Sequence, residues 1–178
     1  TKNAAGADVV ISGVPYDLAV TNRPGTRLGP RAIRAASAQI AWPGGPWRWE
    51  FDPTEVLKIV DWGDMSFDFG RPGDVPAEIE AHAASLLKTG ARLMTFGGDH
   101  FVTYPLLKAH AEKHGPLALL QFDSHSDTWR EDAKRIDHGT MFFHAAQEGI
   151  IDARHSVQIG IRSGNPETHG FTILDADF

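Results

Sequence analysis

The stretch Gln-Phe-Asp-Ser-His-Ser-Asp at residues 121–127 decides how the rest of the chain is interpreted. It follows a short apolar run at residues 116–120, which predicts a buried strand. Asp123, His125 and Asp127 stand at alternate positions, and a strand with its extension directs alternate side chains to one face. We therefore expect these three potential metal ligands to share a face. Carboxylate and imidazole ligands together suit manganese, zinc or iron better than calcium.

A second motif points to the same chemistry, whereas the first alone is also compatible with a solvated turn rich in Asp and Ser. Residues 91–96 predict a strand, and Gly-Gly-Asp-His follows at residues 97–100. Two glycines allow a sharp turn and a close approach to a ligand. Ligands of open α/β sheets bind beyond the carboxyl ends of the strands. If the two strands are neighbours, His100 lies beside the side chains of the Asp-x-His-x-Asp motif. Together these four side chains could hold one metal ion, or could supply part of the ligands of two metal ions bridged by Asp123.

The rest of the chain alternates between strand and helix patterns. Strands are predicted at 9–14, 56–61, 156–162 and 171–174, and helices near 30–36 and at 76–88, 102–114 and 141–147. Such alternation predicts a three-layer α/β/α fold with a mainly parallel sheet covered on both faces. At 178 residues, without repeats or low-complexity tracts, the chain is expected to form one domain over residues 1–178.

The amino-acid composition limits which binding partners and which cellular compartment we expect for this protein. Seventeen Lys and Arg against 23 Asp and Glu give a net charge of −6, which argues against nucleic acid or an anionic membrane as the main partner. The chain contains no cysteine, which excludes disulfides and thiolate ligands. No apolar run approaches the roughly 20 residues of a membrane helix, and the N-terminus lacks a signal-peptide pattern. We therefore expect a cytoplasmic protein.

Several other residues have a functional and a simpler interpretation. His138 in a loop is a candidate proton shuttle, because a free imidazole titrates near neutrality, although a loop histidine is commonly just solvated. His110 and His114 have a ligand spacing, but at a solvated helix end a surface role is favoured. The Gly/Pro/Arg-rich loop 22–30 matches no nucleotide motif and predicts a rim loop or a subunit contact. The tryptophan-rich segment 41–54 predicts core packing or an oligomer contact.

Taken together, these motifs resemble the ureohydrolase (arginase/agmatinase) family, and most closely its agmatinase members. The resemblance rests on GGDH at 97–100, FDSHSD at 122–127, DHGTMF at 137–142, Gly-Pro-x-Ala-Ile-Arg at 29–34 and the segment 156–162. It covers essentially the whole chain. It implies an arginase-like three-layer fold, a dinuclear Mn²⁺ site and hydrolysis of agmatine, a small cationic guanidino substrate, to putrescine and urea.

The resemblance also implies a role for each motif residue. His100 and Asp127 would bind one manganese ion, His125 would bind the other, and Asp123 would bridge the two. His138 falls where family members keep a histidine that relays protons to the leaving amine. Family members assemble into trimers or hexamers, so a homo-oligomer is expected of the full-length form.

The sequence departs from the family pattern in two places. The second motif is usually D-A-H-x-D, and Ser124 here replaces the alanine, which is not a ligand. Family members also continue into a D-x-D-x-x-D-P segment that supplies further aspartate ligands, so that four of six metal-binding side chains are expected here. We therefore expect an arginase-like sheet that is incomplete at the C-terminal side, weak metal binding and little turnover by this chain alone. The alternatives are another ureohydrolase (guanidinobutyrase, arginase or formiminoglutamase), a mononuclear metal hydrolase, or a non-catalytic metal-binding or oligomerisation fragment.

Overall fold

A computed structural model describes residues 3–40, 50–130, 136–163 and 165–175 of the chain. The chain divides into two compact units. The N-terminal unit comprises Thr1–Leu18 and Pro24–Val102, and the C-terminal unit comprises Ala19–Arg23 and Thr103–Phe178. Each unit is described by itself below. The segment 41–49, with its three tryptophans, and the segment 131–135 lie outside the described residues.

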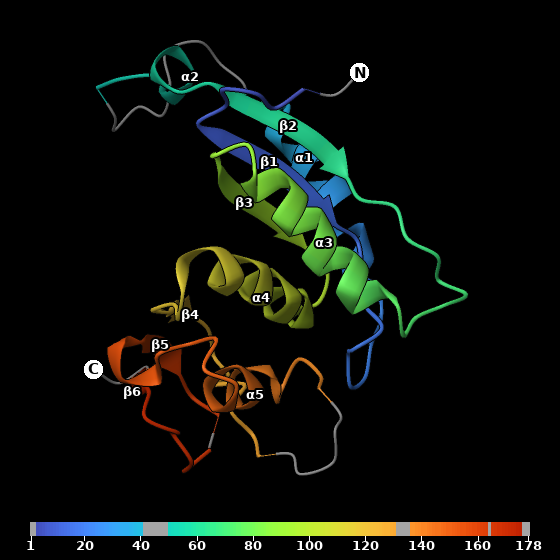
Figure 1. Cartoon of the computed structure of the whole chain (residues 1–178). Coiled ribbons are helices and arrows are strands. Elements are labelled where there is room, and N and C mark those ends of the chain that lie inside the picture. Colours follow the sequence, from blue (N-terminus) through green and yellow to red (C-terminus); the bar gives the residue numbers. More distant parts are fainter. Residues whose placement is uncertain (1–2, 41–49, 131–135, 164, 176–178) are drawn as a thin grey trace. The chain divides into compact units, whose positions relative to one another are not determined.

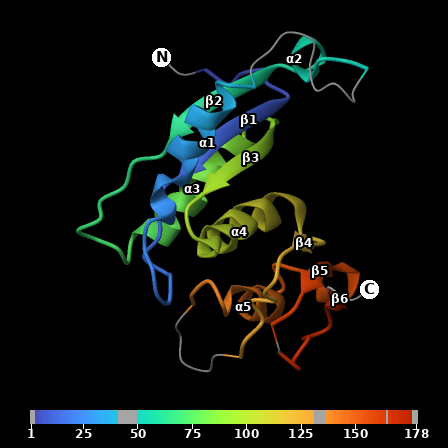
Figure 2. The same ribbon diagram turned by 180° about the vertical axis from the view of Figure 1, so that it is seen from behind.

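The N-terminal unit is built on a three-stranded parallel sheet with the order β2-β1-β3. Its strands are β1 (Val9–Val14), β2 (Ile59–Asp64) and β3 (Arg92–Gly97). In Figure 1 helix α3 (Val75–Leu87) lies in front of this sheet, and in Figure 2, seen from behind, helix α1 (Gly29–Ser37) does. The two helices therefore cover opposite faces. The sheet and its two covers form three layers within this unit.

The two faces of this sheet differ in packing. On the α3 side, Val10 and Leu86 are buried in an apolar core that also contains Ala4, Ala7 and Ala91, with Val60, Trp62 and Leu93 packed against it. On α1, by contrast, only Pro30 is buried, and Ile33 is 44% exposed. Helix α1 is held by polar contacts instead. Its Arg34 donates two hydrogen bonds to the carboxylate of Asp61 on β2, at 2.7 and 2.9 Å.

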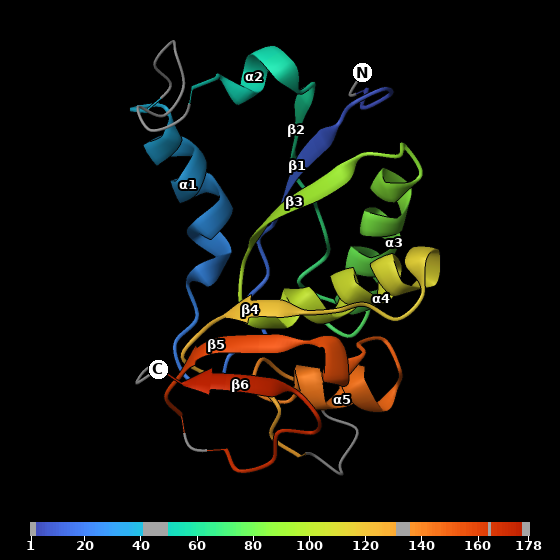
Figure 3. The same ribbon diagram turned by 90° about the vertical axis from the view of Figure 1, so that its left-hand side faces the viewer.

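The C-terminal unit is built on a second parallel sheet with the order β4-β5-β6. Its strands are β4 (Leu120–Phe122), β5 (Val157–Ile161) and β6 (Thr172–Asp175), which lie side by side in Figure 3. Helices α4 (Thr103–His114) and α5 (Met141–Gln147) belong to the same unit. The hydroxyl of Tyr104 on α4 donates to the carboxylate of Glu148, just after α5, at 2.8 Å. This contact is buried on the tyrosine side, since Tyr104 is 6% exposed.

The predicted α/β class with parallel strands is confirmed, and most element boundaries agree within one or two residues. The strand predicted at 56–61 is displaced, because the short helix α2 (Pro53–Val56) precedes β2. Asp52 caps α2 by accepting a hydrogen bond from the backbone of Thr54, and Pro53 stands at its first position, where no N–H is needed. These start signals predict a helix and were not recognised in the sequence. The single-domain prediction over residues 1–178 stays a prediction.

The buried strand predicted at 116–120 is wrong in both position and burial. The strand begins only at Leu120, which is 62% exposed, and Phe122 is 74% exposed. Only Gln121, on the opposite face, is buried. An apolar run predicts a strand covered on both faces, but the described residues cover only one face of β4. In the described part of the chain, no helix is both long and apolar enough to cross a membrane.

Candidate metal centre

The GGDH motif forms a tight turn at the end of β3, in the N-terminal unit. Gly98 has a φ of +28°, and a Cβ there would lie 2.2 Å from the backbone oxygen of Tyr16 and 2.6 Å from that of Val14. Glycine is therefore required by the close approach of two backbone segments. The sharp turn predicted from the pair of glycines is confirmed, whereas the close approach to a ligand stays a prediction. The backbone N–H of Asp99 donates to the oxygen of Tyr16 at 2.8 Å, which fixes the turn against the end of β1.

Asp99 and His100 have different surroundings in this turn. Asp99 is 3% exposed, and its carboxylate accepts a hydrogen bond from the backbone N–H of Phe101 at 2.9 Å. It therefore shapes the chain at the 3₁₀ turn His100–Val102. Burial raises the pKa of the neighbouring Tyr16, and the Asp99 and Asp17 carboxylates add to this rise. His100 is half-buried and follows the sharp turn directly, at the carboxyl end of β3.

The loop of residues 123–127, called here the ligand loop, lies in the C-terminal unit. Beyond Phe122 the backbone is no longer a strand, and Asp127 has a left-handed φ of +51°. The alternation of a strand therefore does not set the directions of the ligand-type side chains. Hydrogen bonds to the neighbouring strand set them instead, beginning with the backbone N–H of Asp123, which donates to the oxygen of Ile159 at 3.0 Å.

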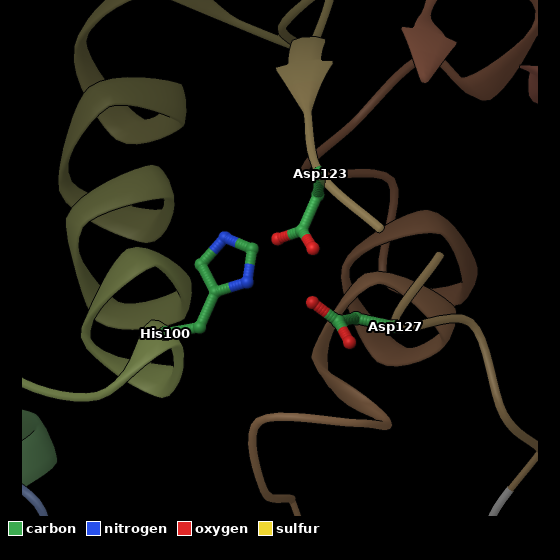
Figure 4. Close-up of side chains that lie close together, drawn as sticks. All are labelled: His100, Asp123 and Asp127. Atoms are coloured by element: carbon green, nitrogen blue, oxygen red, sulfur yellow. The ribbon is translucent and has the colours of Figure 1, made fainter. Parts of the chain in front are cut away.

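The ligand loop brings two of the predicted ligands together. The carboxylates of Asp123 and Asp127 face one another in Figure 4, and each offers an oxygen atom within 4.8 Å of the other. Asp127 is 6% exposed. Two carboxylates at this separation repel each other, so a divalent cation between them would stabilise the arrangement. His100, also labelled in Figure 4, belongs to the N-terminal unit, and its place in one site with these carboxylates is part of the proposal below.

His125 occupies a different position in the ligand loop. Its side chain is 67% exposed, and its Nδ1 lies 3.6 Å from a carboxylate oxygen of Asp123. Ser124 Oγ lies 3.1 Å from the same nitrogen. The third ligand-type side chain of the motif is thus next to Asp123 but more solvated than Asp127, and its role as a ligand stays a prediction.

His138 lies in the turn before α5, in the C-terminal unit. Asp137 shapes this turn, because its carboxylate accepts from the backbone of Gly139 at 2.9 Å and its own N–H donates to Thr140 Oγ1 at 3.0 Å. The ring nitrogen Nε2 of His138 lies 3.2 Å from the hydroxyl oxygen of Thr21. Its role in proton transfer stays a prediction.

Two buried glutamines support the ligand loop and were missed in the sequence. Gln158 on β5 is 0% exposed and Gln121 on β4 is 6% exposed. The sequence does contain a signal, because each glutamine stands between two large apolar residues, where a buried side-chain amide needs a specific partner. By contrast, His110, half of the i, i+4 pair on α4, has its Nδ1 2.7 Å from the oxygen of Leu106 on its own helix, and His114 is exposed.

A sequence model of the arginase family matches residues 7–177. This chain belongs to the arginase family. Among curated arginase-family proteins, the agmatinase of Proteus mirabilis is 54% identical over 173 residues, which cover 97% of this chain and 56% of the relative. The chain therefore spans about half the length of the curated relatives it matches.

Solved structures agree with the assignment to the arginase family. The crystal structure of a hypothetical agmatinase from Burkholderia thailandensis superposes with a TM-score of 0.95 at 50% identity, over 99% of this chain and 56% of that one. The proclavaminate amidino hydrolase of Streptomyces clavuligerus superposes with a TM-score of 0.83 at 38% identity, over 97% of this chain and 59% of that one. The predicted arginase-like fold and the resemblance to the family are thus confirmed.

Proposed function

We propose that the natural protein carrying this sequence is an agmatinase-type ureohydrolase, which hydrolyses agmatine to putrescine and urea with two Mn²⁺ ions. The observation that carries this proposal is the 54% identity to the Proteus mirabilis agmatinase, which extends over 97% of this chain. Because the match extends over 97% of this chain, it spans the 97–142 region that carries the three motifs, and it therefore favours the same chemistry.

Four side chains are proposed as metal ligands: His100, Asp123, His125 and Asp127. The donor set fits a divalent transition metal, since it combines carboxylate oxygens with imidazole nitrogens. The pair Asp123 and Asp127 supports a cation, because two carboxylate oxygens lie within 4.8 Å of each other on one loop. His100 and Asp127 would bind one ion and His125 the other, with Asp123 bridging. Two such ions supply, when bound, a nucleophile from water at neutral pH.

The remaining chemistry falls to the chain's own residues. The carboxylates of Asp123 and Asp127 would offset part of the charge of the bound ions, which lessens the repulsion between those ions and a cationic guanidinium. His138 is proposed to give a proton to the leaving amine, which departs as a neutral or protonated amine only when a proton reaches its nitrogen. An imidazole suits this step because it exchanges protons near neutral pH.

A second substrate within the same reaction class is favoured by one observation. The Streptomyces clavuligerus proclavaminate amidino hydrolase, at 38% identity, is named for a substrate other than agmatine. Guanidinobutyrase, arginase and formiminoglutamase activities remain the alternatives within the family, and the mononuclear hydrolase and the non-catalytic fragment remain the alternatives outside it. Cytoplasmic location and assembly into trimers or hexamers stay predictions that accompany the proposal.

A urea-release assay tests the proposal. The natural protein, loaded with Mn²⁺, is expected to release urea from agmatine faster than from 4-guanidinobutyrate or arginine, and its metal content is expected to be two ions per chain. The 178-residue chain, assayed in parallel, is expected to release little or none. Urea from another guanidino compound alone would replace agmatine as the substrate. One bound ion per chain with full activity would favour the mononuclear hydrolase. If no compound yielded urea, the non-catalytic fragment would be the remaining alternative.

A further inference from the structure

The side-chain amides of Gln158 and Gln121 form a buried chain of hydrogen bonds beneath the ligand loop. Gln158 Nε2 donates to Gln121 Oε1 and to the backbone oxygen of Ser126, both at 2.6 Å. Gln121 Nε2 donates in turn to the backbone oxygen of His125 at 3.1 Å. Two side chains of the sheet thus hold two consecutive carbonyl groups of the loop, at the residues that directly precede Asp127.

The direction of this chain of bonds is fixed by its acceptors. The backbone oxygens of Ser126 and His125 can only accept, so the amide nitrogen of Gln158 must face Ser126 and that of Gln121 must face His125. Gln121 must then present its oxygen to Gln158 and its nitrogen to His125. Because Gln158 is 0% exposed, water does not compete for these positions. The pair therefore has one stable arrangement, which specifies where the carbonyls of His125 and Ser126 lie.

The continuation of β5 holds the other end of the ligand loop. The backbone oxygen of Ser124 accepts from the N–H groups of Arg162 and Ser163, at 3.0 and 3.1 Å. These donors follow a bulge at Gly160, which has a φ of +85° and where a Cβ would lie 3.3 Å from the oxygen of Asp123. With the N–H of Asp123 also bonded to β5, each residue from Asp123 to Ser126 has a backbone group held by the sheet or its extension.

On the far side of the loop, α5 supplies one more contact. The backbone N–H of Phe142 donates to the oxygen of Asp127 at 3.0 Å. Asp127 is thus fixed on both sides, because Gln158 holds the carbonyl of the preceding Ser126 and the start of α5 holds the carbonyl of Asp127 itself. These contacts explain how a non-glycine residue keeps a φ of +51°, a conformation that costs free energy unless the surroundings impose it.

We propose that Gln158 and Gln121 are positioning residues that preset the ligand loop for its divalent cation. This inference rests on the metal site of the proposed function. The amides touch no donor atom of that site; they act through the backbone of His125 and Ser126, and so bring the carboxylates of Asp123 and Asp127 within reach of one ion. Partners behind metal ligands are commonly worth about 10- to 100-fold in metal affinity.

The test compares Mn²⁺ binding by the natural protein and by its Gln158→Met variant, with calorimetry for affinity and electron paramagnetic resonance for the signal of a coupled pair of ions. Methionine fills a similar volume but donates no hydrogen bond. We expect affinity to fall by about 10- to 100-fold and the coupled-pair signal to give way to that of isolated ions. Should Gln158→Met not fold, Gln121→Met removes the bond to His125 while leaving Gln158 its bond to Ser126.

Ser156→Ala, at the residue directly before the same strand, is the matched control. Ser156 is also 0% exposed, and its hydroxyl accepts from Leu119 N–H at 2.9 Å and donates to the Asp152 oxygen at 2.7 Å, neither of which belongs to the ligand loop. It is expected to lower thermal stability and leave Mn²⁺ affinity and the resonance signal unchanged. Equal losses of affinity in Gln158→Met and Ser156→Ala, or no loss in either glutamine variant, would overturn the positioning role while the metal site stands. No Mn²⁺ binding by the unaltered protein would overturn both.

Discussion

Asp17 and Arg27 form an ion pair in which the carboxylate is almost completely shielded, with Asp17 1% exposed. Arg27 Nε donates to Asp17 Oδ1 at 2.6 Å, and the backbone N–H groups of Gly25 and Arg27 donate to Oδ2 at 2.6 and 3.2 Å. One carboxylate thus holds Gly25 and Arg27, in the middle of the Gly/Pro/Arg-rich loop 22–30. The bond from Arg27 and those from the backbone lower the pKa of Asp17 below its ordinary 3.8, against the opposing effect of burial.

This lowered pKa predicts how stability depends on pH. A carboxyl whose folded-state pKa is depressed stabilises the fold fully above its unfolded value, 3.8, and loses that contribution as the pH falls through the folded-state pKa. Asp17→Asn is therefore expected to lower the free energy of unfolding by about 1–3 kcal/mol at pH 7. The difference from the unaltered chain is expected to shrink below pH 3.8, as measured by urea unfolding at several pH values.

Asp68→Asn provides the comparison for this pH series. The side chain of Asp68 is 60% exposed and lies 3.5 Å from Arg71, so its ion pair is screened by water. We expect that variant to stay within about 0.5 kcal/mol of the unaltered chain. A constant difference for Asp17→Asn across the acid range would show that the carboxylate does not act through its charge.

The close approach at Gly98 predicts that this position accepts no side chain. A methyl group there would meet the backbone oxygens of Tyr16 and Val14, which no side-chain rotation can relieve. Gly98→Ala is expected to cost about 2–4 kcal/mol in unfolding free energy. Gly73→Ala is the control, since a Cβ at Gly73 meets nothing within 4 Å. The melting temperatures of the two variants are measured by thermal denaturation. Equal melting temperatures would contradict the prediction that position 98 accepts no side chain.

The contact of Arg34 with Asp61 predicts that the attachment of α1 to the sheet depends on the guanidinium group of Arg34. Because α1 buries only Pro30, the two-pronged bond from Arg34 supplies much of what holds the helix to β2. Arg34→Lys keeps the charge but loses the paired geometry, so we expect about 1 kcal/mol of destabilisation and faster hydrogen exchange confined to α1. Arg31→Lys, at an exposed position of the same helix, should leave exchange unchanged. Faster exchange in both variants would reject a special role for Arg34.

The fold class was predictable from the sequence because it depends on the spacing of apolar residues and on the glycines and prolines that end helices and strands. The helix at 141–147 and the strand at 9–14 were placed correctly, since an apolar pattern marks each element and Gly149 and Pro15 follow their ends. The exposure of Leu120 and Phe122 was not predictable, because an apolar run shows that a strand prefers burial and not what covers it. Burial on the second face depends on whichever other segments are present.

The candidate site was predictable as a set of residue types, less so as a geometry. Asp123 and Asp127 come together as expected, but through a left-handed residue and not through strand alternation. Sequence spacing describes directions only while the backbone stays regular, and this loop leaves the strand at Phe122. The supporting amides of Gln121 and Gln158 belong to two strands far apart in the sequence, so only the pairing of β4 with β5 reveals their contact.

Asp123→Asn tests the bridging role in the proposed metal site. An amide is a poorer ligand than a carboxylate, so the variant of the natural protein is expected to lose both ions. Bound Mn²⁺ stabilises the folded state in proportion to the logarithm of its concentration over the dissociation constant. Added Mn²⁺ should therefore raise the melting temperature of the unaltered protein and not that of the variant. If the variant retained two ions at unchanged affinity, the bridging role proposed for Asp123 would be rejected.

His138→Asn separates proton transfer from metal binding. His138 lies in the turn before α5 with its Nε2 3.2 Å from Thr21 Oγ1, and it is not one of the proposed ligands. Asparagine keeps a polar side chain but does not exchange protons near neutrality, so we expect urea release in the natural protein to fall about 10²- to 10⁴-fold. Manganese content and the melting temperature with Mn²⁺ should stay unchanged. His155→Asn is the control, because His155 is an exposed histidine whose Nδ1 lies 2.7 Å from Asp152, in a hydrogen bond outside the proposed site. A loss of metal in His138→Asn would identify the residue as a ligand or a support of the site, whereas full turnover would exclude it from the reaction.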